Sequence, residues 1–103
     1  MITRVWRGWT ATPADADAYE RLLREQVLPG IREVDGFLGA TVLRRRTAAG
    51  VEFLVQTRFA SMDSVRGFAG PTTDAPVIEP EARALLSRAD DRALHYETAF
   101  ELD

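Results

Sequence analysis

Residues 37–59, which read FLGATVLRRRTAAGVEFLVQTRF, decide the fold. Two runs typical of β-strands, residues 37–47 and 51–59, are separated by Ala48-Ala49-Gly50, a short glycine-containing connection that favours a β-hairpin. Side chains of a strand alternate between its two faces, so every second residue of the second run shares a face. That predicted core face carries Phe53, Val55, Thr57 and Phe59. The segment therefore predicts two antiparallel strands of a sheet with one buried face.

A long helical pattern precedes the hairpin. Thr12 can cap its first turn, and Pro13 suits the first helical position. Apolar residues recur with helical spacing over residues 19–34. Pro29-Gly30 predicts a kink or break inside this helix, and Asp35-Gly36 predicts its end.

Two shorter helical patterns follow the hairpin. Ser61 can cap the first of them, and Gly70 closes it. Residues 70–80 are rich in helix and strand breakers and are predicted to form a loop. The second short helix begins at Pro80.

Strand patterns at both ends complete the fold. Residues 2–10 and 92–102 are predicted strands, which makes the order β-α-β-β-α-(α)-β. This is the split βαβ order of ferredoxin-like α+β domains, in which helices cover one face of an antiparallel four-stranded sheet. The other face is predicted to expose Val5, Trp9, Leu43 and Leu54. An apolar patch of that kind favours burial against a second copy in a two-fold homodimer.

Length and composition limit the classes of function. The 103 residues are predicted to form a single domain, residues 1–103, and the formal charge of −3 gives no basis for nucleic-acid binding. The absence of cysteine excludes disulfides, a thiolate nucleophile and a cysteine-ligated metal. No membrane span or signal peptide is predicted, so a cytoplasmic location and no membrane partner are expected.

His95, the only histidine, is the first candidate for chemistry, because histidine titrates near neutral pH. Glu97 lies on the same face of the predicted strand and could orient the imidazole as a general base. The alternative is a partly buried histidine whose hydrogen bonds are satisfied at the dimer interface.

Trp6 and Arg4 share a face of the first strand and are candidates for the wall of a pocket. An indole suits such a wall or the core, and a guanidinium at the pocket mouth could clamp a carboxylate or phenolate. The alternative for Arg4 is a surface arginine whose stem packs on the sheet. No glycine-rich phosphate loop, metal-ligand spacing or serine triad is found. An enzyme built from this chain would rely on pocket shape, a lone base and a reactive substrate.

Several segments together resemble the antibiotic biosynthesis monooxygenase family. They are Arg4-Val-Trp-Arg-Gly8, Pro29-Gly30, Asp35-Gly-Phe-Leu-Gly-Ala40, Phe53-Leu54, Phe59-Ala-Ser61, Val65-Arg-Gly-Phe-Ala-Gly70 and His95-Tyr96-Glu97. The resemblance implies a dimeric α+β barrel with a ligand cleft between the sheet and the helices of each subunit. It implies that Trp6, Phe59 and Phe68, with Arg4 and His95, surround that cleft. The axial histidine of the haem-degrading branch would fall near Val77-Ile78, neither of which can ligate iron, so haem degradation is disfavoured.

Three functions are consistent with these patterns. The first is a cofactor-independent monooxygenase of a phenolic or polyketide-like aromatic substrate, with no metal and no cofactor. In it, His95, assisted by Glu97, deprotonates a substrate that is held by Arg4 and the aromatic walls Trp6, Phe59 and Phe68. The second is a non-catalytic dimeric protein that binds a small aromatic or hydrophobic ligand. The third is a non-oxidative isomerase or cyclase on the same scaffold, where enclosure of a reactive substrate supplies most of the effect.

Overall fold

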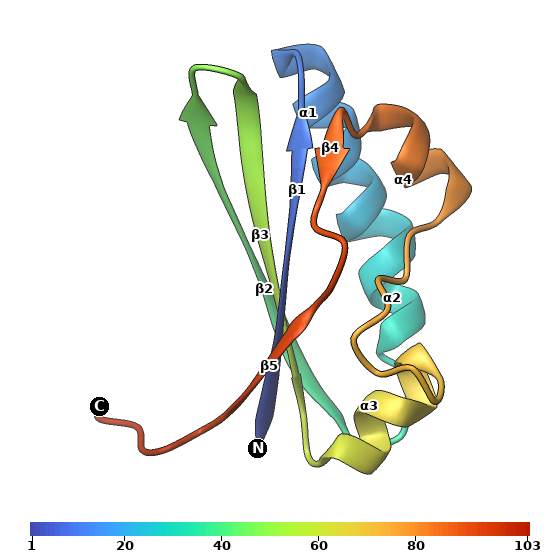
Figure 1. The fold of residues 1–103 in the computed structure, drawn as a ribbon, viewed down its shortest axis with the longest axis vertical. Helices are drawn as coiled ribbons and strands as arrows, with labels where there is room; N and C mark the ends of the chain where they lie inside the picture. The colour runs from blue at the N-terminus through green and yellow to red at the C-terminus, as the bar shows by residue number, and fades with distance from the viewer.

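Helices cover one face of a five-stranded antiparallel sheet in the computed structural model, which describes residues 1–103 (Figure 1). The strands are β1 (Ile2–Thr10), β2 (Phe37–Thr47), β3 (Gly50–Phe59), β4 (Arg88–Ala89) and β5 (Leu94–Glu97). Their order is β2-β3-β1-β4, and β5 also pairs with β1. The helical segments are α1 (Pro13–Leu22), the π-helical turn η1 (Leu23–Val27), α2 (Leu28–Ile31), α3 (Met62–Ala69) and α4 (Pro80–Leu85). The predicted ferredoxin-like α+β class is confirmed. No helix is both long enough and apolar enough to cross a membrane.

The last strand differs from its prediction. In place of one strand over residues 92–102, two short strands, β4 and β5, pair with opposite halves of β1. Glu97 pairs with Ile2, the first residue of β1, so β1 offers no residues that could pair with the chain beyond Thr98. Figure 1 shows this C-terminal segment leaving the sheet.

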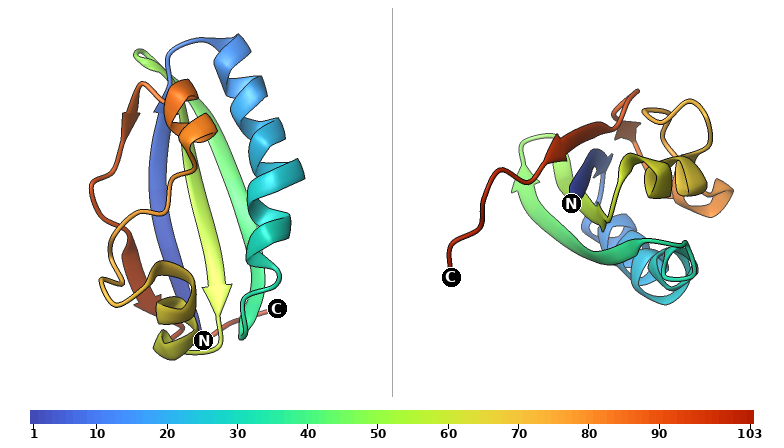
Figure 2. Two further views of the ribbon diagram at one scale, coloured as in Figure 1. Left: turned by 90° about the vertical axis from the view of Figure 1, so that its right-hand side faces the viewer. Right: turned by 90° about the horizontal axis from the view of Figure 1, so that it is seen from below.

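The first helix does not break at Pro29, as one reading of the sequence predicted. Proline lacks an N–H group, and its ring collides with the carbonyl four residues earlier in a regular α-helix. The wider turn η1 ends at Val27, two residues before Pro29. The Leu28 N–H that follows it donates to the Leu23 carbonyl, one residue further back than in an α-helix. The chain therefore continues as one helical rod to Ile31 (Figure 2).

The hairpin between β2 and β3 turns through Ala48 and Ala49, with Thr47 paired to Gly50. Gly50 has a φ of 130°, and a Cβ added there would lie 2.1 Å from the Thr10 carbonyl oxygen. Only glycine fits this corner, because β1 and β3 approach each other too closely for a side chain.

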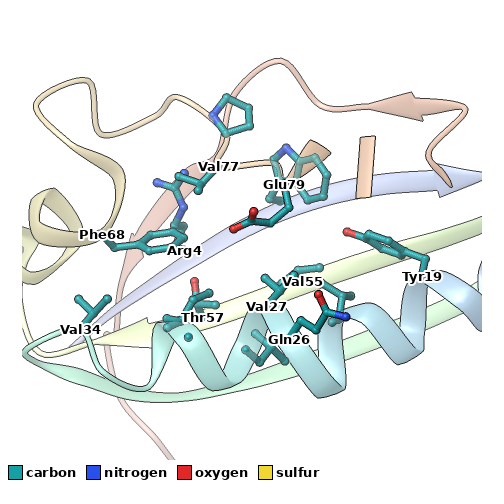
Figure 3. A pocket seen from close by; sticks show the side chains of 16 residues that line it. Arg4, Tyr19, Gln26, Val27, Val34, Val55, Thr57, Phe68, Val77 and Glu79 are labelled. Atoms are coloured by element: carbon teal, nitrogen blue, oxygen red, sulfur yellow. The ribbon is translucent and has the colours of Figure 1, made fainter. Parts of the chain in front are cut away.

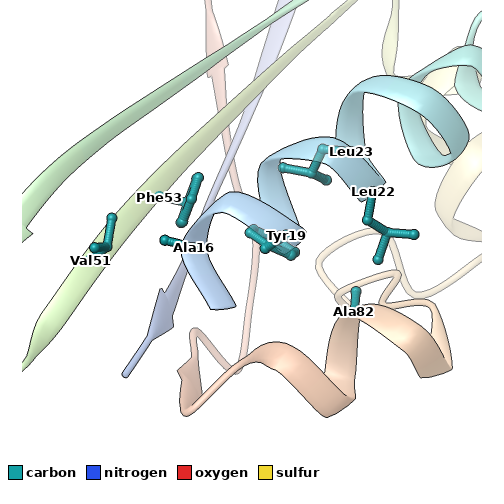
Figure 4. Packing of buried hydrophobic residues seen from close by; sticks show 7 residues of the cluster. All are labelled: Ala16, Tyr19, Leu22, Leu23, Val51, Phe53 and Ala82. Atoms are coloured by element: carbon teal, nitrogen blue, oxygen red, sulfur yellow. The ribbon is translucent and has the colours of Figure 1, made fainter. Parts of the chain in front are cut away.

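Two apolar clusters hold the helices on the sheet. The first gathers around Tyr19 of α1 and Phe53 of β3, whose rings meet edge to face with centroids 4.9 Å apart (Figure 4). The second gathers around Phe59 at the other end of β3 and includes Ile31. Val55 and Thr57 lie between Phe53 and Phe59 on the same face of β3, so they bridge the two clusters. This bridge is the floor of the site described below.

The cap of α1 provides a test of the local folding argument. The Thr12 side-chain oxygen accepts a hydrogen bond from the Asp15 N–H at 3.1 Å. We expect Thr12→Ala to lower the free energy of unfolding by about 1 kcal/mol, because the N–H loses its partner. Thr12→Ser keeps the hydroxyl and should retain most of that stability. Urea denaturation of both variants checks this, and equal losses would contradict the capping role.

Candidate functional site

A cavity of about 320 Å³ lies between the sheet and the helices, in the gap between the two apolar clusters (Figure 3). Its floor is formed by Val55 and Thr57 of β3 together with Arg4 and Trp6 of β1. The loop between α3 and α4 faces this floor from the opposite side. Both pairs of floor residues belong to the helix-facing side of the sheet, as the alternation of the strands requires.

The walls of the cavity are mostly apolar. One wall comes from the long helical rod, and the widened turn η1 contributes to it directly. The apolar wall residues are Leu23, Val27, Leu28, Ile31, Val34, Phe68, Pro76 and Val77. A concave, mostly apolar space of this volume with a few polar groups is typical of a site for a small organic molecule.

Arg4 is buried, with 4% of its surface exposed, and both terminal nitrogens of its guanidinium donate hydrogen bonds to backbone carbonyls. Nη1 donates to the Thr73 carbonyl and Nη2 donates to the Ala75 carbonyl at 2.8 Å. The guanidinium carbon lies 5.5 Å from the centre of the Phe68 ring. Burial lowers the pKa of Arg4, while the nearby Asp74 carboxylate raises it. Arg4 therefore fastens the loop of residues 71–79 to the sheet.

His95 also contacts this guanidinium. Its Nε2 lies 3.0 Å from Nη1 of Arg4, and β1–β5 pairing places the two residues directly opposite each other. Burial and then the Arg4 charge lower the pKa of His95, against a smaller raising effect of Asp74. The imidazole is therefore neutral at pH 7, and because arginine can only donate, Nε2 accepts and the proton lies on Nδ1.

Of the remaining predicted site residues, two line the cavity and two do not. Trp6 and Phe68 line the cavity, and the Trp6 Nε1–H donates to the Asp90 carbonyl at 3.0 Å. Phe59 does not line it: its ring is fully buried in the second cluster, stacked behind Phe68 with centroids 5.8 Å apart. Glu97 is exposed and shares no hydrogen bond with His95, although both lie on the same face of β5.

Four polar residues of the cavity were missed by the sequence analysis: Tyr19, Gln26, Thr57 and Glu79. Tyr19 and Thr57 occupy ordinary core positions of a helix and a strand, so their periodicity predicts packing. Glu79 precedes α4 but does not cap it with its side chain, and Figure 3 shows its carboxylate directed over the cavity. A hydroxyl at an otherwise apolar core position is the one feature that could have pointed to Tyr19 and Thr57.

The side chains of this chain do not form a group of three or more histidine, cysteine, aspartate or glutamate residues suited to a metal ion. The polar side chains that line the cavity are those of Arg4, Tyr19, Gln26, Thr57 and Glu79.

A known protein family and several solved structures are similar to this chain. A family model described as "Antibiotic biosynthesis monooxygenase" matches residues 1–70. No curated protein sequence matches the chain. Among solved structures, the chain is similar to a monooxygenase from the gene ActVA-Orf6 of Streptomyces coelicolor in complex with Nanaomycin D, with 20% identity, a TM-score of 0.65, and coverage of 98% of this chain and 89% of that one.

Two further structures have the same fold. One is SnoaB of Streptomyces nogalater, described as a cofactor-independent oxygenase, with 21% identity, a TM-score of 0.62, and coverage of 98% of this chain and 95% of that chain. The other is a mutant of MhuD with two manganese protoporphyrin IX molecules bound per active site, with 16% identity, a TM-score of 0.66, and coverage of 100% and 99%. At these sequence identities, the three structural similarities establish the fold alone.

Proposed function

The chain belongs to the antibiotic biosynthesis monooxygenase family, and from that premise we propose that it oxidises a phenolic or polyketide-like aromatic substrate with dioxygen and no cofactor. The observation that carries the proposal is the cavity itself, which is walled by Trp6 and Phe68 and holds a buried cation, Arg4. Such a site can enclose a planar aromatic ring and stabilise the anion that forms when the substrate loses a proton.

The proposed reaction needs little from the protein beyond enclosure and proton transfer. Deprotonation makes an electron-rich carbanion, which reacts with dioxygen directly. When a CH2 group becomes a carbonyl, one oxygen atom enters the product, and the other leaves as water with the two hydrogens. The desolvated apolar walls keep the anion away from bulk water, and Arg4 offsets its charge.

His95 as the general base stays a prediction, and a pair of variants tests it. In His95→Gln, the amide oxygen can still accept from Arg4, but the side chain cannot take a proton at neutral pH. His95→Ala removes both abilities. If His95 is the base, both variants should lose turnover by about a hundredfold or more. If it only positions Arg4, His95→Gln should keep most of the activity and His95→Ala should lose it.

The measurement is oxygen uptake with anthrone, a tricyclic compound with an activated CH2 group and a phenolic tautomer, corrected for the rate without protein. One oxygen molecule consumed for each anthraquinone formed supports the oxygenase. Binding of anthrone without uptake in any form of the protein would contradict it. That result would favour the isomerase or cyclase, or a ligand-binding protein.

The ligand-binding alternative has an observation in its favour. The lone pair of His95 Nε2 is already engaged by Arg4, and His95 is absent from the cavity wall. Glu79 is the only carboxylate on that wall. A protein that holds an aromatic molecule without turnover needs no free base.

Haem fits these residues poorly. The only histidine accepts a hydrogen bond from Arg4, and Val77, where the haem-degrading branch would need its ligand, lines the cavity with an aliphatic side chain. We therefore derive no step through haem.

We also propose that two copies associate through the open face of the sheet. This face carries Val5, Leu43, Leu54, Leu94 and Tyr96, and it is opposite the face that the helices cover. Burial of this patch against its symmetry mate would remove apolar surface from water in both copies.

A further inference from the structure

We propose that the hydroxyl groups of Tyr19 and Thr57 recognise oxygen atoms on two edges of a planar aromatic ligand and so determine which ligand the cavity accepts. This inference rests on the cavity being the ligand site of the proposed function. It does not require that the ligand is turned over.

The Tyr19 hydroxyl is a polar group in the cavity wall without a protein partner. The residue is 2% exposed, and its ring is fixed against Phe53. The hydroxyl makes no hydrogen bond within the protein, yet its oxygen is not sealed from the cavity, and Figure 3 shows it directed into the space. Burial raises the pKa of Tyr19, so the phenol stays protonated at neutral pH and is available as a donor.

The Thr57 hydroxyl has the same character at another part of the cavity. Thr57 is 4% exposed, lines the cavity and makes no hydrogen bond within the protein (Figure 3). It is paired across the strands with Arg4, at the end nearer the Phe59 cluster, whereas Tyr19 belongs to the Phe53 cluster. Val55, between them on β3, supplies an apolar surface.

Two unpartnered hydroxyls in an apolar cavity select for a particular chemistry. Both hydroxyls are open to water in the empty cavity. A ligand that excludes this water without supplying a hydrogen-bond partner leaves a buried polar group unpaired, at a cost of about 1–3 kcal/mol, so a ligand that supplies the partner binds more tightly than one that does not. A site built to hydrogen-bond a ligand oxygen therefore rejects the hydrocarbon analogue. The ligand class that fits is a flat aromatic compound with carbonyl or hydroxyl oxygens on two edges, such as a quinone.

Equilibrium dialysis with 1,4-naphthoquinone and naphthalene separates recognition of oxygen from recognition of shape. The chain has no cysteine that a quinone could alkylate. Tyr19→Phe and Thr57→Val each remove one hydroxyl and keep the volume. Each should weaken naphthoquinone binding by about tenfold and change naphthalene binding by less than about twofold. Thermal denaturation of each variant verifies that it is folded.

Thr10→Val is the matched control. The Thr10 hydroxyl is also buried and without a partner, but it is sealed in the structure and does not line the cavity. Its removal should leave the affinity for both ligands unchanged. Equal losses for the two ligands, or no loss in Tyr19→Phe and Thr57→Val, would overturn the inference and leave the cavity as a ligand site. Binding of neither ligand by the unsubstituted protein would overturn the ligand site itself, and this inference with it.

Discussion

Replacement of Arg4 by methionine should lower the free energy of unfolding by about 3 kcal/mol and release the loop of residues 71–79 from the sheet. Hydrogen bonds to a charged group are each worth about 1.5–3 kcal/mol. Arg4 donates to two carbonyls of this loop, those of Thr73 and Ala75. Both carbonyls would lose their partner in the variant, and so would Nε2 of His95.

The expected loss of stability is taken at the lower end of the range for two such hydrogen bonds, because burial of the cation has a cost of its own. That cost is visible in the lowered pKa of Arg4. No carboxylate pairs directly with the guanidinium, and the nearby Asp74 lies 3.7 Å from Arg92. Methionine removes that cost together with the hydrogen bonds and retains a long apolar side chain near Phe68, so the measured loss is the net of the two effects.

Urea denaturation measures the stability, and hydrogen exchange of the amides in residues 71–79 measures the release of the loop. Arg21→Met is the control, because Arg21 is exposed on α1 and makes no hydrogen bond, yet its loss changes the net charge equally. That control should lie within about 0.5 kcal/mol of the unsubstituted protein. Unchanged exchange in the loop of Arg4→Met would show that Arg4 does not fasten it.

The parts of the fold that the sequence predicts are those with strong local causes. The hairpin around Gly50, the cap at Thr12 and the alternation of β3 each follow from neighbouring residues, and all three occur in the structure. The prediction of the last strand was wrong in length, because the alternation of residues 98–102 does not show whether a neighbouring strand extends far enough to pair with them. Its length is limited by where β1 begins, at Ile2.

The site also has features that local sequence patterns predict and features that depend on how distant segments pack. Alternation along β1 places Arg4 and Trp6 on the helix-facing side, and both line the cavity. The contact between Arg4 and His95 joins residues 91 positions apart and depends on the register of β5, which no local pattern provides. Phe68 lines the cavity and Phe59 lies behind it because of the position in which α3 packs. The sequence does not distinguish the two residues, since both are phenylalanines on predicted core faces.

Leu54→Asp should convert the proposed homodimer into a monomer, with the dissociation constant raised at least about a thousandfold. Leu54 lies opposite Leu43 on the open face of the sheet. Leu43 is 48% exposed, and Leu94 and Tyr96 of β5 are each 55% exposed. The ion pair Arg7–Asp90 lies directly beside Leu54, and Arg45–Glu52 lies one same-face pair further along the strands. Charged groups therefore border the apolar residues on that side, as at the rim of protein interfaces.

The magnitude follows from burial of unpaired charge. Two-fold symmetry places each substitution in the interface twice, and an isolated buried carboxylate costs several kcal/mol, while 1.4 kcal/mol corresponds to tenfold in affinity. Arg7, the cross-strand neighbour of Leu54, cannot readily compensate, since Nε and Nη2 already donate to the two oxygens of Asp90 at 2.9 and 3.1 Å. Ala84→Asp adds the same charge on exposed α4 and should leave the dimer intact.

Size-exclusion chromatography with light scattering distinguishes these outcomes, and a monomeric unsubstituted protein or a dimeric Leu54→Asp variant would contradict the interface. The same variant also separates assembly from ligand binding. The floor residues Arg4 and Thr57 lie on the helix-covered face of the sheet, whereas Leu54 lies on the opposite face. A folded Leu54→Asp monomer should therefore bind naphthoquinone within about twofold of the dimer, because the sheet stands between the interface and the cavity. A large loss of affinity would instead mean that the partner subunit helps to form the site.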